Sequence, residues 1–432
     1  MAGPIQSNLL PDTADISSEE HTLIGGCNLV ELADEFGTPL FVYDEDHLRS
    51  RCREAVRAFD GNVAYATKAF LCIEMAKLAY EEGMNLDVAT GGELYIARKA
   101  DVPGERIVMH GNNKSFEELN MALKEGVGRI VVDSFNELDR LEELCADLNT
   151  STKVLLRVTP GVEAHTHEFV STGQEDSKFG FTVRSGIAEE AVQRARSCKN
   201  LELLGLHAHI GSQVFDVRPF AKAVGVLAEF AAPYDFPELV VGGGLGVPYV
   251  EGESAPSIQE WADAIFDACA EAGVKSSVGA EPGRSIVASA AVTLYTVGTI
   301  KEVPDHRTYV SVDGGMSDNP RPITYQSNYS ACLVNNPLNN NSKSKYTVAG
   351  KHCESGDVLF KDIELGNCKT GDLICVFGTG AYNNSMSSNY NRIPRPAAIL
   401  VFNGEADIIQ RRESSNDLLR YDVLPDRFLK KS

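Results

Sequence analysis

The sequence predicts an α/β fold: a TIM-type (β/α)8 barrel followed by an all-β domain that also takes in the N-terminal segment. From about residue 60, short apolar stretches alternate with stretches of helical periodicity. Eight such units extend to about residue 280, which suits a barrel of roughly 250 residues. After about residue 300 the apolar stretches are separated only by turns rich in Gly, Asn and Pro, as in all-β domains. An open doubly wound sheet is the alternative, but the strand count and the lack of a nucleotide-binding fingerprint favour the barrel.

The apolar stretches mark the barrel strands, and the stretches between them mark the helices. The strands are expected at 63–67, 85–89, 106–110, 129–133, 153–158, 203–210, 239–244 and 277–281. The helices are expected at 73–82, 92–100, 115–125, 135–148, 188–197, 218–231 and 258–272. Ser115 and Glu118 have the spacing of a capping box, which marks the start of the helix at 115–125.

The second domain is predicted from strands without long helices between them. These strands are expected at 308–313, 346–349, 372–377 and 397–402. A further strand at 39–43 precedes the barrel and is expected to pair with this domain. We therefore place the barrel at residues 46–303 and the β domain at 1–45 and 304–432. The Asn- and Ser-rich tract 335–345 is expected to be a polar loop.

The composition excludes several classes of protein. Asp and Glu number 61 against 40 Lys and Arg, a formal net charge of −21, which argues against a broad nucleic-acid or anionic-membrane surface. No apolar run reaches the length of a membrane span, and residues 1–20 lack the basic and apolar regions of a signal peptide. The ten cysteines are scattered without a CxxC pair, as is usual for reduced thiols. A globular cytoplasmic protein is expected.

Lys68 stands at the end of the first predicted barrel strand. Active sites of TIM barrels lie at the C-terminal ends of the strands. A lysine that points inward there would be partly desolvated, which lowers its pKa and supplies the neutral amine that a Schiff base needs. An ordinary surface lysine is the alternative when position alone is considered.

His207 and His209 lie on one face of the sixth predicted strand, because side chains alternate along a strand. Two histidines could begin a metal site, but no third ligand follows at a suitable spacing, so we expect no metal. We interpret His209 as a flat group that stacks against a ring and His207 as a core histidine.

The last two predicted strands end in sequences suited to an anion. The seventh ends in the glycine-rich run 242–246, and the eighth in Glu281-Pro282-Gly283-Arg284. Consecutive glycines expose backbone N–H groups, and barrel phosphate sites are commonly built from the loops after strands seven and eight. Tight turns and an ion pair that closes the barrel are the structural alternatives. An amine, a stacking group, a phosphate cradle and a carboxylate together match the needs of pyridoxal phosphate.

Motifs over roughly residues 40–420 resemble the diaminopimelate decarboxylases, pyridoxal-phosphate enzymes of the alanine-racemase-like barrel fold. The matching segments are VAYATK (63–68), TPGVEAHTH (159–167), DSKFGF (176–181), HIGSQ (209–213), GGGLG (242–246), EPGR (281–284), CESGD (353–357) and GAY (380–382). Ornithine and arginine decarboxylases share several of them, whereas EAHTH and CESGD are more specific to the diaminopimelate branch.

The resemblance implies roles for the cofactor-binding residues. Lys68 corresponds to the lysine that forms the imine with the cofactor, His209 to the residue stacked on the cofactor ring, and Glu281 to the partner of the ring nitrogen. Asp87 matches a carboxylate near that lysine. The remaining implied contacts, to the cofactor or its phosphate, are Ser212, Gly243, Gly244, Gly283, Arg284 and Tyr382.

The resemblance also implies roles in substrate binding and catalysis. Arg321 and Tyr325 would bind the distal carboxylate of the substrate, and Glu354 its distal ammonium group, while Arg284 and Tyr382 would also contact the substrate. Cys353 would reprotonate the carbon that has lost CO₂. Because Cys353 and Glu354 reach the site from a partner subunit in this family, a homodimer is implied. The sequence 326–329 departs from the pattern of many relatives.

The implied reaction converts meso-2,6-diaminopimelate to L-lysine and CO₂, the last step of lysine biosynthesis. Three alternatives remain open at this point. One is a decarboxylase of another basic amino acid or of carboxynorspermidine on the same fold, and another is an amino-acid racemase. The third is a non-catalytic, cofactor-binding regulatory relative. No role follows from the sequence for His165 and His167.

Overall fold

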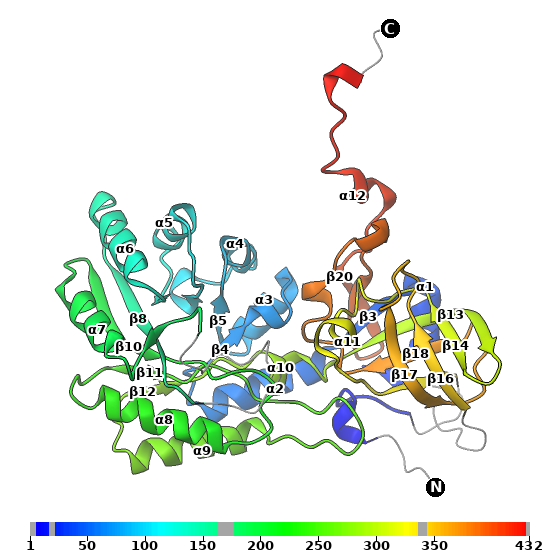
Figure 1. Ribbon diagram of the computed structural model, residues 1–432, viewed down its shortest axis with the longest axis horizontal. Coiled ribbons are helices and arrows are strands. Elements are labelled where there is room, and N and C mark those ends of the chain that lie inside the picture. Colours follow the sequence, from blue (N-terminus) through cyan, green and yellow to red (C-terminus); the bar gives the residue numbers. More distant parts are fainter. Residues whose placement is uncertain (1–5, 17–21, 163–176, 336–343, 429–432) are drawn as a thin grey trace. The chain divides into compact units, whose positions relative to one another are not determined.

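The computed structural model describes residues 6–16, 22–162, 177–335 and 344–428 (Figure 1). Its chain divides into two compact units. The barrel unit comprises residues 46–290 and 380–385, and the β unit comprises residues up to 45, 291–379 and 386 onward. The segments EAHTH (163–167) and Asp176, with His165 and His167, lie outside the described residues.

The barrel unit contains the eight predicted parallel strands. In the order in which they pair, they are β12 (Ser277–Gly279), β11 (Glu238–Val240), β10 (Leu201–His207), β8 (Thr152–Thr159), β7 (Arg129–Val132), β6 (Ile107–Met109), β5 (Asn85–Val88) and β4 (Ala64–Ala66). A bridge between Val63 and Ala280 joins the first strand to the last, and the N–H of Ala66 donates to the carbonyl of Pro282 at 3.1 Å. The predicted barrel is therefore confirmed. A short strand, β9 (Phe181–Thr182), pairs with β8.

Helices alternate with these strands, as the periodicity predicts. They are α2 (Glu45–Ala58), α3 (Ile73–Glu81), α4 (Gly91–Lys99), α5 (Phe116–Lys124), α6 (Phe135–Asp147), α7 (Ile187–Ser197), α8 (Arg218–Ala231), α9 (Ile258–Glu271) and α10 (Arg284–Val287). Side-chain oxygens of Thr90, Ser115, Ser134 and Ser257 cap helices by accepting a backbone N–H of the first turn. Ser115 and Glu118 form the predicted capping box.

Apolar side chains from neighbouring strands pack in the barrel interior. Val108, Val131, Leu155, Leu204 and Val240 form one buried cluster contributed by β6, β7, β8, β10 and β11. This packed layer closes the interior and leaves the polar chemistry to the strand ends.

The β unit is a mixed sheet in the order β17 (Val358–Leu365), β16 (Ser344–Ala349), β14 (Arg307–Val312), β13 (Ala291–Val303), β3 (Leu40–Asp44), β19 (Ala397–Phe402) and β20 (Glu405–Gln410). Two further strands, β18 (Leu373–Phe377) and β15 (Ala331–Leu333), extend from β13. The strand β3 pairs with β13 and β19, so the predicted pairing of segment 39–43 with this domain is confirmed. The short elements β1 (Leu23–Ile24), β2 (Cys27–Asn28), α1 (Leu29–Phe36), α11 (Arg321–Tyr325) and α12 (Ser415–Leu419) complete it.

The end of the barrel differs from the expectation. Residues 291–303, which we assigned to the barrel, form β13, whose partners β3, β14 and β18 all belong to the β unit. The boundary accordingly lies at residue 290. The expected loop 335–345 falls mostly outside the described residues, and its last two residues, Ser344 and Lys345, begin β16. Within the described parts of the chain, every helix falls short of the length and apolar character that crossing a membrane demands.

Candidate active site

A pocket of about 360 Å³ lies at the C-terminal ends of the barrel strands. Its lining consists of Ala66, Lys68, His209, Ser212, Gly243, Gly244, Glu281, Gly283, Arg284 and Tyr382. Apart from Ala66, all of these are residues that the sequence marked as candidate cofactor contacts, and Asp87 is the one such candidate absent from the lining.

Lys68 lies in η2 (Thr67–Ala69), a single 3-10 turn that follows β4. Its side chain is exposed, so the expected desolvation is wrong for this structure. The physical reason is that the strand ends at Ala66 and the turn carries Lys68 into the open pocket rather than into the barrel interior. An accessible amine of this kind can be reached by an aldehyde from solvent.

Tyr382 closes the side of the pocket next to this turn. Its N–H donates to the carbonyl of Ala69 at 2.9 Å, and its φ of +62° places it in the left-handed region that non-glycine residues rarely adopt. The Arg284 guanidinium lies 4.7 Å from the centre of its ring. The backbone hydrogen bond and the ring contact together fix the tyrosine at the pocket wall.

His209 follows the end of β10 and is half-buried in the pocket lining. The N–H of Gly243 donates to its Nδ1 at 3.3 Å. Burial, followed by the positive charges of Lys68 and Arg157, holds the pKa of His209 well below 6.5. The imidazole is therefore neutral near pH 7, which suits a flat group that stacks on an aromatic ring.

Glycines form the floor of the pocket because no side chain fits there. A Cβ at Gly243 would lie 2.1 Å from the carbonyl oxygen of Glu281, and one at Gly244 would lie 2.2 Å from that of Gly211. Gly244 also has a φ of +117°. Without side chains at these positions the backbone of the floor can approach a ligand closely, as in glycine-rich anion-binding loops.

Arg284 supplies the positive charge of the pocket. Its two terminal nitrogens donate to the hydroxyl of Tyr249 at 2.6 Å and to that of Ser212 at 3.0 Å. Among the described residues, its buried Nε and the buried Oγ of the adjacent Ser285 have no hydrogen-bond partner. Buried donors without acceptors are costly, so these groups are suited to an anionic ligand. The cation, the hydroxyls and the glycine floor together fit the phosphate of pyridoxal phosphate.

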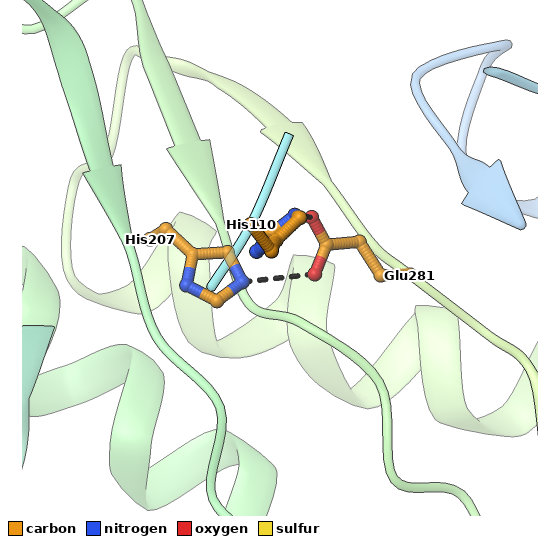
Figure 2. Close-up of side chains that lie close together, drawn as sticks. All are labelled: His110, His207 and Glu281. Atoms are coloured by element: carbon orange, nitrogen blue, oxygen red, sulfur yellow. Dashed lines mark hydrogen bonds and ion pairs between the residues drawn. The ribbon is translucent and has the colours of Figure 1, made fainter. Parts of the chain in front are cut away.

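Glu281 is the buried carboxylate of the site, and two histidines contact it. Nε2 of His207, at the end of β10, lies 2.8 Å from its Oε2, and Nε2 of His110, which directly follows β6, lies 2.9 Å from its Oε1. Figure 2 shows both imidazoles directed at the two oxygens of this carboxylate. The two histidines lower the pKa of Glu281 well below 4.5 against the effect of burial, so the group is ionised.

His110 is the contact that sequence reasoning missed. His110, His207 and Glu281 together could hold a metal ion, because their potential ligand atoms all lie within 4.8 Å of one another. From the sequence we had expected no metal here. The position of His110 at a strand end was the available signal, but closeness to Glu281 arises only when the barrel closes. The expectation that His207 is a core histidine agrees with its burial and its carboxylate partner.

Asp87, on β5, is buried beside this group, with Oδ1 3.6 Å from Nε2 of His110. Burial raises the pKa of Asp87 to about 6, while His110 and Lys68 oppose the rise. The carboxyl therefore lies behind the pocket wall and adds a titrating group next to the histidines.

The β unit carries the predicted substrate-binding residues. Arg321 is buried at the start of α11, where its guanidinium donates to the hydroxyl of Tyr329 at 2.6 Å and to that of Ser327 at 3.3 Å. Tyr325 is half-buried at the other end of the same helix. The unusual segment 326–329 thus supplies two side chains that orient Arg321, a role that sequence reasoning missed.

Cys353 and Glu354 are exposed on a loop of the β unit. Asp357 anchors this loop, because its carboxylate accepts the backbone N–H of Met316 at 2.7 Å and that of His352 at 2.9 Å. The N–H of Cys353 donates to Oδ1 of Asn391 at 2.9 Å. A firmly held loop therefore presents a thiol and a carboxylate at the surface.

Comparisons with known proteins identify relatives over nearly the whole chain. The model of the pyridoxal-dependent decarboxylase family, pyridoxal binding domain, matches residues 45–288. A diaminopimelate decarboxylase of Bacillus subtilis (strain 168) is 47% identical over 430 residues, which cover 96% of this chain and 98% of the relative.

Solved structures give the same result. A diaminopimelate decarboxylase from M. jannaschii in complex with L-lysine has a TM-score of 0.91 and 35% identity, over 97% of this chain and 99% of that one. The enzyme from Helicobacter pylori complexed with L-lysine has a TM-score of 0.84 and 31% identity, over 91% of this chain and 98% of that one. The chain therefore belongs to the diaminopimelate decarboxylase family and is a pyridoxal-phosphate-dependent decarboxylase.

Proposed function

We propose that this chain converts meso-2,6-diaminopimelate to L-lysine and CO₂, the last step of lysine biosynthesis. The observation that carries the proposal is the pocket of the barrel unit, in which an accessible lysine, a buried carboxylate and an arginine over a glycine floor meet. Near-full-length similarity to diaminopimelate decarboxylases, two of them in complex with L-lysine, supports the choice of substrate.

The barrel residues hold the cofactor. Pyridoxal phosphate, when bound, supplies an electron sink for the pair left behind by CO₂. Lys68 binds its aldehyde carbon, and Glu281 pairs with its ring nitrogen. His209 stacks on its ring, and Tyr382 and Asp87 support the site. The phosphate is held by Ser212, Gly243, Gly244, Gly283 and Arg284.

The β unit selects the substrate and returns the proton. Arg321 and Tyr325 bind the distal carboxylate, and Glu354 binds the distal ammonium group. Arg284 and Tyr382 contact the substrate from the barrel unit. Cys353 donates a proton to the carbon that has lost CO₂, a task that a positioned thiol can perform as a general acid.

Two active sites are shared within a homodimer, because Cys353 and Glu354 reach the site of the partner subunit. Their exposure on an anchored loop supports this arrangement. Mixing the inactive variants Lys68→Ala and Cys353→Ala tests it. Random exchange of subunits should restore about a quarter of the wild-type activity, since half the dimers then carry one intact site. Absence of any recovery, with exchange verified by tagged subunits, would argue against shared sites.

The ten unpaired cysteines support a cytoplasmic location.

A substrate panel tests the activity itself. Lysine and ornithine offer Glu354 a distal ammonium group but lack the distal carboxylate, so they leave Arg321 unpaired, and sites with an unpaired polar group can discriminate by roughly 10⁴–10⁵-fold. With added cofactor, CO₂ release from diaminopimelate should greatly exceed release from lysine, ornithine or arginine. A comparable kcat/KM for lysine and diaminopimelate would overturn the assignment of the substrate.

A further inference from the structure

We propose that His110 and His207 are paired positioning residues that fix the Glu281 carboxylate as the partner of the cofactor's ring nitrogen. The inference rests on the proposed role of Glu281 and adds two residues to it. Neither histidine lines the pocket, so both act through the carboxylate that does.

Each histidine contacts a different oxygen of the carboxylate. Nε2 of His207 is hydrogen-bonded to Oε2 at 2.8 Å, whereas Nε2 of His110 makes an ion-pair contact with Oε1 at 2.9 Å that lacks hydrogen-bond geometry. The two imidazoles meet edge to face with their centres 4.8 Å apart. A carboxylate offers about four acceptor positions, so each oxygen keeps capacity for one more donor. The histidines thus prevent rotation of the group and leave it able to accept a proton-bearing ring nitrogen.

The surroundings of His207 are consistent with this task. It is buried, and among the described residues its Nδ1 has no hydrogen-bond partner. With the proton on Nε2, the ring donates to Glu281 and Nδ1 is left as an acceptor.

Charges on the neighbouring strands complete the environment of Glu281. Asp87 on β5 lies 3.6 Å from the same Nε2 of His110 that contacts Glu281, and Arg157 on β8 contributes a buried positive charge that interacts with both carboxyl groups. The other ionisable groups near this cluster are Lys68, Glu93, His209 and Asp133, and Asp133 also pairs with Arg157 at 3.8 Å. The two histidines, with Arg157, favour the ionised form of Glu281 in this buried site.

The test compares pyridoxal phosphate with its deaza analogue, in which carbon replaces the ring nitrogen. The dissociation constant of the deaza analogue divided by that of pyridoxal phosphate measures the contribution of the ring-nitrogen contact to binding. This ratio can be measured without turnover. We expect His207→Asn and His110→Asn each to reduce this ratio about tenfold, because asparagine does not reach the Nε2 position. Glutamine places an amide near that position, so His207→Gln and His110→Gln should keep most of the ratio. The buried histidine His47, which contacts Ser289 rather than Glu281, provides the control His47→Asn.

Separate outcomes decide the inference and the function on which it rests. An unchanged ratio in both asparagine variants, or an equal loss in the asparagine and glutamine variants, overturns the positioning role. Stoichiometric metal in the purified holoenzyme that disappears on His110→Asn also overturns it, in favour of a metal site. If Glu281→Gln itself leaves the ratio unchanged, the assigned role of Glu281 fails instead. The ¹⁵N chemical shift of the ring nitrogen in labelled cofactor should move toward the value of the unprotonated nitrogen in the asparagine variants only. An unchanged chemical shift in those variants overturns the inference.

Discussion

Arg284 and Ser212 join two loops of the barrel through a hydrogen bond of 3.0 Å between a guanidinium nitrogen and Oγ. Ser212 follows β10, and Arg284 begins α10 after β12, so the pair connects the strand ends on either side of the glycine run. Tyr249 holds the other terminal nitrogen of the same guanidinium at 2.6 Å. The arginine is thereby fixed in place before any anion arrives, which reduces the entropy cost of binding one.

Replacing Arg284 with Gln should weaken the binding of pyridoxal phosphate. Loss of a fixed cation from a phosphate site is expected to lower affinity by about 10–100-fold. Equilibrium dialysis of the apoprotein measures the change. Arg129→Gln is the matched control, because Arg129 pairs with Glu238 at the opposite ends of the barrel strands. Equal affinity losses in the two variants would contradict a phosphate-binding role for Arg284.

Lys68 should be the lysine that becomes attached to the cofactor. Borohydride reduction of the holoenzyme followed by peptide mass spectrometry is expected to show the adduct at Lys68, and Lys68→Ala should lose both the adduct and the visible absorbance of the bound cofactor. Lys114 serves as an internal control, because its buried Nζ is bonded to Glu137 at 2.6 Å and to two backbone carbonyls. An adduct elsewhere, or unchanged absorbance in Lys68→Ala, would refute the assignment.

Cys353 should be the cysteine that reacts first with iodoacetamide, and activity should fall in step. The other nine cysteines are buried, and burial raises the pKa of Cys52 and Cys332 to about 12, which suppresses their thiolates. Cys353→Ala is expected to lower kcat by at least about 100-fold with little change in cofactor affinity. Cys269→Ala, in the buried face of α9, is the control. Normal turnover of Cys353→Ala would exclude its role as the proton donor.

The local pattern of apolar and polar residues along the sequence was sufficient to predict most of the barrel and the lining of its pocket. Strand ends such as Lys68 and Glu281 could be assigned because a closed parallel barrel gathers all the C-terminal ends of its strands at one rim. The capping box of Ser115 and Glu118 could be predicted because it depends on four consecutive residues.

Features that depend on distant partners could not be predicted. The strand β13 continues directly from the barrel, and only its pairing with β3, β14 and β18 assigns it to the β unit. The contact of His110 with Glu281 joins positions 171 residues apart, so nothing in the local pattern distinguishes His110 from a core histidine. The exposure of Lys68 depends on the 3-10 turn that ends β4, which the sequence pattern did not indicate.

Tyr329→Phe should weaken substrate binding through Arg321. The tyrosine hydroxyl accepts a hydrogen bond from the buried guanidinium at 2.6 Å, and the substitution removes this contact while leaving the one to Ser327 in place. We expect KM for diaminopimelate to rise about fivefold while kcat is retained, because the lost contact orients a binding group rather than a reacting one. Tyr309→Phe is a matched control, since Tyr309 packs against Arg307 on β14. A fall in kcat with unchanged KM would contradict this role.

Asp318 should make the stability of the protein depend on pH. Its carboxyl is buried in the β unit, where it accepts hydrogen bonds from the hydroxyl of Tyr295 and from the N–H of Gly315, and burial raises its pKa from 3.8 to about 7. Between these two values the folded state holds a proton that the unfolded state has released. The contribution of this group to stability therefore falls as pH rises from about 4 to about 7, by at most about 4 kcal/mol.

Asp318→Asn tests this sign, because the amide keeps one acceptor oxygen and cannot titrate. Relative to wild type, its free energy of unfolding in urea should increase between about pH 5 and about pH 8. Asp417→Asn is the control: Arg411 holds the pKa of Asp417 far below its ordinary value, so this exposed group stays ionised over the same interval and its replacement should give a constant offset. Parallel pH profiles for the wild type and Asp318→Asn would show that Asp318 is ionised in the folded protein. Its hydrogen bonds with Tyr295 and Gly315 would then outweigh the cost of burying its charge.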